Sequence, residues 1–107
     1  MKYSIIISPI TQNSNATEHA FKFIQSILKD KSSEISVFFY GYAVNFAFNY
    51  DSNWHEFSKQ NMTLIACSTI AEDYLKNNQS PVNYIKLAGL GQWMESVHGA
   101  DKNIEFV

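Results

Sequence analysis

Short, unbroken apolar runs constrain the fold of this chain more than any other sequence feature. The first run, Met1 to Ser8, is MKYSIIIS, and the second, Ile35 to Tyr40, is ISVFFY. Neither alternates strictly with polar residues and both contain β-branched residues, a pattern typical of strands that are covered on both faces. A third run, Met62 to Ala66, has the same character. These runs predict a sheet with helices packed on both sides.

Helical spacing appears between these runs. Apolar residues recur every three or four positions from Ala16 to Leu28, which predicts a helix with one stripe facing the sheet. Asn15 with Glu18 predicts a capping box at its start. After the third run, Ser68 or Thr69 is the expected cap of another helix, and the spacing from Thr69 to Glu72 predicts a second capping box.

The last third of the chain continues the alternation. Val82 to Leu87 predicts a weaker strand, Gly89 to His98 a short helix, and Asn103 to Val107 a terminal strand. Alternating strands and helices build right-handed βαβ units. We therefore expect an α/β fold, a three-layer sandwich around a mostly parallel sheet of about five strands. Its 107 residues are expected to form a single domain, residues 1–107.

Composition narrows the classes of function. The net charge is −2, whereas nucleic-acid binders usually present a basic face, so direct and avid nucleic-acid binding is not expected. The single cysteine cannot form an internal disulfide, no signal-like segment opens the chain, and no apolar stretch is long enough to span a bilayer. We expect a cytoplasmic protein with a reduced thiol and no membrane association.

Cys67, the only cysteine, follows the third apolar run directly and precedes the predicted helix. Sites in open parallel sheets form beyond the carboxyl ends of the strands, where loops lead into helix N-termini. A helix start favours a thiolate through its partial positive charge and its unpaired amides. Cys67 is therefore a candidate nucleophile, expected to be reachable from outside. Free cysteines are more often packed hydrophobes, and the nearby Glu72 and Asp73 disfavour a thiolate.

Other candidate sites are weaker. The three histidines lie in separate segments without metal-ligand spacing, so no metal is expected. The loop SPITQNSN after the first strand has no glycine, which gives nucleotide binding little support. The segment from Tyr42 to Phe57 carries an aromatic residue every three or four positions. Core packing and a partner interface are equally compatible with that stripe, and Asp51 to Asn53 is expected to interrupt its helix.

Several stretches together resemble the DsrE-like sulfur-relay proteins, and most closely their TusD branch. These are, in chain order, KYSIIISP, AFKFIQSIL, VFFYGYAV, LIACSTIA and KLAGLGQWMESVHGADKNIEFV. The resemblance implies a small flavodoxin-like α/β domain that assembles with related subunits into a hetero- or homo-oligomer. It also implies that Cys67 accepts sulfane sulfur as a persulfide from a small carrier protein and passes it on, in the TusD branch toward 2-thiouridine in tRNA.

Three hypotheses follow for function. The preferred one is a persulfide relay, hence a sulfurtransferase, in which Cys67 is catalytic without a cofactor. The backbone amides of Ser68 and Thr69 would support its thiolate, and Tyr42, Phe46, Trp54 and Trp93 would form subunit interfaces. In place of tRNA thiolation, such a relay could serve intracellular sulfur oxidation. The second hypothesis is a non-catalytic assembly subunit of a DsrE-like complex. An unrelated module that binds an anionic ligand is the third hypothesis, and the sequence shows no basic pocket for it.

Overall fold

The computed structural model describes residues 1–107 and contains one five-stranded, all-parallel sheet. The strand order is β4-β3-β2-β1-β5. Each of the three apolar runs forms a strand, and the sheet as a whole consists of β1 (Lys2–Ile7), β2 (Glu34–Phe39), β3 (Met62–Cys67), β4 (Lys86–Ala88) and β5 (Lys102–Phe106). The predicted α/β fold with a parallel sheet is confirmed.

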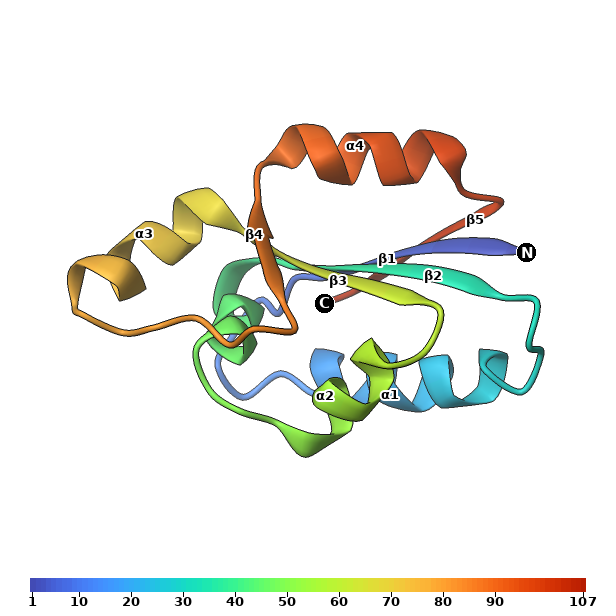
Figure 1. Ribbon diagram of the computed structural model, residues 1–107, viewed down its shortest axis with the longest axis horizontal. Coiled ribbons are helices and arrows are strands. Elements are labelled where there is room, and N and C mark those ends of the chain that lie inside the picture. The colour runs from blue at the N-terminus through green and yellow to red at the C-terminus, as the bar shows by residue number, and fades with distance from the viewer.

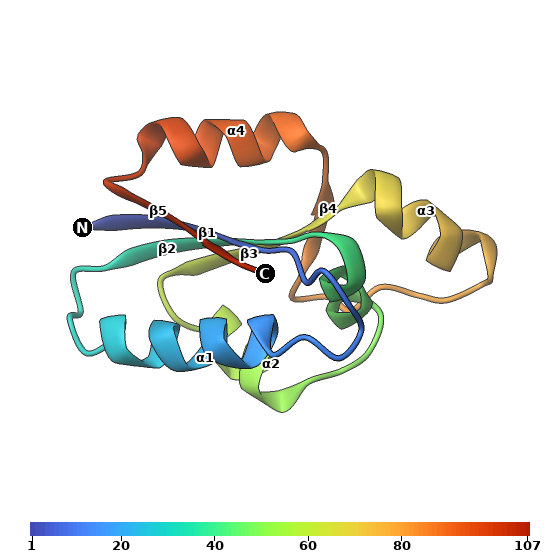
Figure 2. The same cartoon turned by 180° about the vertical axis from the view of Figure 1, so that it is seen from behind.

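Helices lie on both faces of this sheet. Figures 1 and 2 show α1 (Ala16–Ile27) and α2 (Ser52–Ser58) along one face and α4 (Leu90–Gly99) along the other. A 3-10 helix, η1 (Gly41–Ala47), follows β2, and α3 (Ser68–Lys76) extends beyond the carboxyl ends of the strands. The carboxyl edge of the sheet is therefore bounded by η1, α3 and the loop that follows β1. No helix is long and apolar enough to cross a membrane.

Strand alternation assigns the core side chains to the two faces. Phe39 points toward α2, where its ring meets Trp54 edge-on with a centroid distance of 5.1 Å. Its neighbour Phe38 points the other way and stacks on Trp93 of α4, with the centroids 6.0 Å apart. On that same face the hydroxyls of Ser4 and Ser96 lie 3.0 Å apart, so this buried serine is hydrogen-bonded. The 21 buried apolar residues form one continuous cluster, and each large side chain in it contributes roughly 1.5–3 kcal/mol through burial.

Both predicted capping boxes are wrong. Asn15 precedes α1, but its φ of −90° and ψ of 16° are not the extended backbone of a typical side-chain cap, and the Ser14 hydroxyl accepts the Ala16 N–H instead, at 3.1 Å. At α3 the N-cap is Cys67 itself, so Ser68 lies inside the helix and no side chain caps it. By contrast, Asp51 caps α2 by accepting the Trp54 N–H at 3.1 Å.

The weaker strand predicted at Val82 to Leu87 is shorter and begins later, at Lys86. The Val82 N–H donates to the Ala47 carbonyl at 2.7 Å, and the Tyr84 hydroxyl accepts the Asp51 N–H at 2.9 Å. These bonds tie the segment before β4 to the loops around η1 and α2 rather than to β3. Tertiary contacts therefore override the β propensity of this stretch.

Candidate functional site at the carboxyl end of β3

Cys67 lies where the sequence predicts it, at the junction of a strand and a helix. It is the last residue of β3 and the N-cap of α3, with φ −62° and ψ 117°. Its register partner on the neighbouring strand is Ala88 of β4. The cysteine thus stands at the carboxyl edge of a parallel sheet, where α/β proteins place their sites.

The thiol is nevertheless buried. Cys67 is 3% exposed and belongs to the main hydrophobic cluster, and no hydrogen bond involves its sulfur. Because its backbone is still extended, its side chain shares a face with Ile65, two residues earlier, and that face is the covered one beneath α4. The expectation that this thiol is reachable from outside is therefore wrong for the isolated chain in this conformation.

The residues expected to support a thiolate are the first two of α3. Ser68 is half-buried and Thr69 is exposed, and as the opening residues of a helix they have backbone N–H groups without an intrahelical acceptor. The positive end of the α3 dipole therefore points toward Cys67. Glu72 and Asp73 lie farther along the same helix and are exposed to solvent.

Neither of the nearby lysines in the sequence is placed beside the thiol. Lys59 precedes β3 and pairs with Glu56 at 3.2 Å, so a six-residue strand, about 20 Å long at roughly 3.3 Å per residue, separates it from Cys67. Lys76 lies in the last turn of α3, at the end opposite to the cysteine. No group of three or more His, Cys, Asp or Glu side chains is arranged to hold a metal ion.

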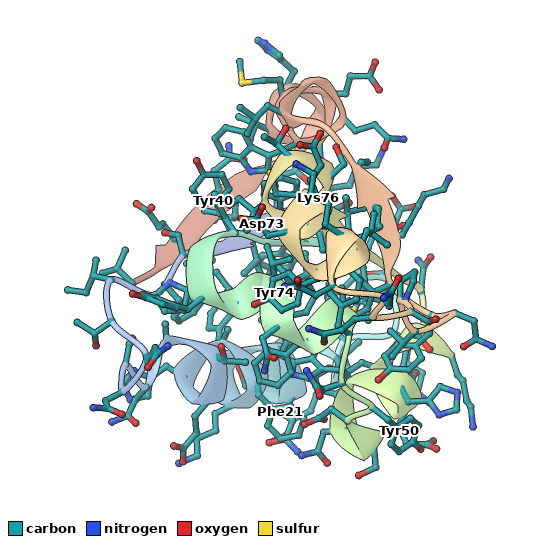
Figure 3. The ribbon with its side chains drawn as sticks, turned by 90° about the vertical axis from the view of Figure 1, so that its left-hand side faces the viewer. Phe21, Tyr40, Tyr50, Asp73, Tyr74 and Lys76 are labelled. Atoms are coloured by element: carbon teal, nitrogen blue, oxygen red, sulfur yellow. The ribbon has the colours of Figure 1, made fainter.

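The helix that begins at Cys67 is only lightly attached to the rest of the molecule. Its single buried residue is Ala71, while Leu75 is 44% exposed. Tyr74 supplies the main aromatic contact by stacking on Phe48, with centroids 4.7 Å apart and rings nearly parallel. Ile70 is half-buried against the core, whereas Thr69, Glu72, Asp73 and Lys76 are exposed, and Figure 3 shows Asp73 and Lys76 on this helix. The helix that begins at Cys67 is thus the helix of this edge with the fewest buried residues besides α4.

The aromatic residues predicted to form interfaces do not share one environment. Tyr42 is 51% exposed, and Phe46 and Trp93 are half-buried. Trp54 is only 2% exposed and packs inside the chain, so its predicted place in a subunit interface is wrong. The stripe is split between η1 and α2, and the Asp51 cap that starts α2 is the physical reason for the interruption.

A cavity of about 670 Å³ opens at the same carboxyl edge, between the loop after β1, the start of α1, η1 and α2. Figure 3 looks onto this edge and shows Tyr74 above Phe21, both of which line the cavity. Cys67 does not line it. Sequence reasoning missed this cavity, because the polar loop SPITQNSN was considered only for phosphate, and its asparagines and hydroxyls were the available signal.

The model of the DsrE/DsrF-like family matches residues 1–106, nearly the entire chain. The chain belongs to the DsrE/DsrF-like family. A comparison with curated proteins found no match.

Two solved structures show the same fold as this DsrE/DsrF-like chain. The YchN protein from E. coli superposes with a TM-score of 0.83 at 13% identity, covering 99% of this chain and 100% of YchN. MTH1491 from Methanobacterium thermoautotrophicum, a protein of unknown function, gives a TM-score of 0.75 at 15% identity, covering 96% and 97% of the two chains. At such low identity the likeness concerns the fold. For this DsrE/DsrF-like protein, the role of Cys67 must be argued from its own geometry.

Proposed function

We propose that this protein is a sulfur relay in which Cys67 carries sulfane sulfur as a persulfide. One observation carries the proposal: the only thiol of a DsrE/DsrF-like chain is the N-cap of a helix at the carboxyl edge of its sheet. The dipole and free amides at the start of α3 favour an anion there. Both the thiolate and the persulfide that it forms are anions.

The transfer step balances without an external oxidant. The Cys67 thiolate attacks the outer sulfur of a donor persulfide, a new S–S bond forms, and the donor S–S bond breaks. The donor cysteine leaves as a thiolate with the bonding electron pair, while Cys67 holds the outer sulfur. In the second step an acceptor thiolate attacks that outer sulfur and Cys67 leaves as a thiolate. Sulfur itself is the cargo, and neither step calls for a cofactor.

Burial of Cys67 requires an opening step before transfer. The face of Cys67 is closed in the isolated chain, but α3 buries only one residue, so displacing its first turn costs few apolar contacts. We propose that a docking partner displaces the start of α3 and exposes the sulfur. Elements with few buried contacts open at low free energy.

The finer assignment follows the TusD branch. We propose that the sulfur proceeds toward 2-thiouridine in tRNA in the cytoplasm, with small carrier proteins as donor and acceptor. Related DsrE-like chains would share a hetero- or homo-oligomer with this one. A relay in intracellular sulfur oxidation is the alternative destination, and the same Cys67 chemistry would serve both.

A second candidate function is that of an assembly subunit in which Cys67 is only a packed side chain. The observation that favours it is the 3% exposure of Cys67 together with the absence of a hydrogen bond to its sulfur. Cysteines buried in apolar surroundings are generally inert. The two functions predict different behaviour of the native chain, because the relay requires local opening at Cys67.

Alkylation of the native protein in low urea separates these two functions. In the relay, local opening at α3 makes the rate of Cys67 alkylation nearly independent of urea below the unfolding transition. In an inert subunit, the rate follows global unfolding and rises steeply with urea. The double variant Cys67→Ala/Thr69→Cys is the matched reference, because it carries an exposed thiol in the same helical turn. If the rate of Cys67 alkylation rises with urea in proportion to global unfolding, both with and without the partner chains, the relay is contradicted.

A further inference from the structure

The cavity at the carboxyl edge is built by segments that are far apart in the sequence. Its volume is about 670 Å³, comparable to the sites of small organic ligands. Polar side chains from the loop after β1 and from η1 line its mouth, namely Thr11, Gln12, Ser14, Asn15 and Asn45. Cys67 does not line the cavity, so binding here can be measured without sulfur transfer.

The charged groups of the cavity are all acidic. Glu18 and Asp51 line it, and no lysine or arginine does. The nearest ion-pair partner is Lys22, which binds Glu18 at 3.3 Å, but both side chains are more than half exposed, so solvent screens this pair strongly. Asp51 uses one oxygen, Oδ1, to accept the Trp54 N–H. Its other oxygen makes no hydrogen bond within the chain and is available to a ligand.

Aromatic side chains also line the same cavity. Phe21 and Phe46 both line it and both meet Trp54 edge-on, with centroid distances of 6.1 Å and 6.5 Å. Tyr42 and Tyr74 add two further aromatic rings to the lining. The faces of aromatic rings attract cations through their quadrupole. Carboxylates and aromatic rings thus favour the same kind of ligand.

We propose that this cavity binds an organic cation, an alkylammonium or guanidinium group, between Asp51 and Glu18 and against the rings of Phe21 and Phe46, with the buried Trp54 behind them. Anionic ligands are disfavoured, because they would meet two carboxylates and no basic side chain. The apolar part of such a cation packs on the rings while its charged head reaches the carboxylates. The cation is either a free amine or the side chain of a lysine or arginine on a docking protein.

Four probes of equal chain length test the charge requirement. Butylammonium and butylguanidinium are titrated against the folded protein, with butanol as the neutral control and butyrate as the anionic control. The readout is the indole N–H signal of each tryptophan in an NMR spectrum. Trp54 lines the cavity, whereas Trp93 packs on the opposite face of the sheet, so only the Trp54 signal should shift. Equal shifts with butanol or butyrate, or none with either cation, would overturn the proposal.

Charge-neutral variants test the carboxylates without removing the fold. Asp51→Asn keeps a good N-cap for α2, and Glu18→Gln keeps the shape of the side chain. Each is expected to weaken butylammonium binding about fivefold, as for loss of one partly exposed ion pair. Glu56→Gln is the control, because Glu56 lies on α2 outside the cavity, and it should leave the affinity unchanged. Equal affinity in all three variants contradicts the proposed site.

A blocked lysine, N-acetyl-lysine-methylamide, distinguishes the two sources of the cation. Binding of blocked lysine and butylammonium with similar affinity indicates that the cavity accepts a side chain from a docking protein. Binding of butylammonium alone indicates a free amine, because the cavity then excludes the peptide groups. If neither probe binds, the proposed cation site is wrong. The proposed relay would still stand, because sulfur loading of Cys67 is measured separately.

Discussion

At the scale of single residues, the burial of Cys67 follows from strand geometry. Its backbone stays extended to the end of β3, so its side chain continues the alternation and faces the covered side of the sheet. The sequence was sufficient to predict that Cys67 joins a strand to a helix. Its accessibility was not predictable, because it depends on where α3 and α4 pack, and local patterns do not encode that packing.

Replacement of Cys67 should show this burial in the free energy of unfolding. Cys67→Ser places a hydroxyl in an apolar environment without a partner, which costs about 1–3 kcal/mol. Cys67→Ala loses only the packing of one sulfur atom and should be the more stable of the two variants. Urea denaturation followed by circular dichroism measures both. A serine variant as stable as the wild type would show that this side chain is solvated.

Asp30 gives a second prediction, on pH dependence. A hydrogen bond from the Ser32 hydroxyl, together with one from the Ser32 N–H, lowers the pKa of the Asp30 carboxyl below its ordinary value. A carboxyl with a depressed pKa in the folded state stabilises the fold above its unfolded pKa and loses that contribution as pH falls through its folded pKa.

Asp30→Ala should therefore lower the melting temperature slightly at neutral pH. The difference from wild type should shrink in acid, as pH falls from about 4, the ordinary aspartate value, to the depressed folded-state pKa below it. If the difference in melting temperature between wild type and Asp30→Ala is the same at neutral and at strongly acidic pH, the lowered pKa of Asp30 is contradicted. Thermal unfolding at a series of pH values provides the measurement.

At the scale of elements, unbroken apolar runs were enough to predict β1, β2 and β3. Their side chains are buried on both faces, and the corresponding sequence pattern is local. The stretch before β4 could not be predicted, since it is held by the distant groups of Ala47 and Asp51. Helix caps were also mispredicted at α1 and α3, because a cap depends on the backbone angles of one residue and not on its type alone.

The Asp51 cap provides a prediction for α2. Asp51→Ala leaves the Trp54 N–H without its acceptor and should cost about 1 kcal/mol of stability. Asp51→Asn should cost only a small part of that, because asparagine is an equally good cap. Chemical denaturation of both variants measures the difference. Equal losses for alanine and asparagine would mean that charge, and not the hydrogen bond, stabilises this helix end.

The light attachment of α3 provides a prediction for the opening step. Tyr74→Ala removes the ring that stacks on Phe48, and an aromatic pair contributes roughly 0.5–1.5 kcal/mol beyond its burial. Alkylation of Cys67 in the native protein should therefore become several-fold faster, by up to about tenfold. Leu75→Ala is the control on the same helix, because Leu75 is 44% exposed. Equal acceleration by both variants would show that general destabilisation is responsible.

At the scale of the whole molecule, the carboxyl edge of the sheet holds two separate features. One is the buried thiol at the start of α3, and the other is the acidic, aromatic cavity beside α1 and α2. The position of the first could be predicted because a single residue defines it, but its burial could not. The second could not, because segments from Pro9 to Tyr74 meet there only in the folded chain. The chain belongs to the DsrE/DsrF-like family, and the proposed sulfur relay depends on Cys67.

The most direct test of the relay is the mass of the intact protein after incubation with a cysteine desulfurase and cysteine, alone and with its partner chains. The relay predicts that the wild type gains one sulfur atom, which a reducing thiol removes, and that Cys67→Ala gains none. A wild-type mass that stays unchanged under every condition, or an equal gain in the alanine variant, would contradict the role of Cys67 as a sulfur carrier.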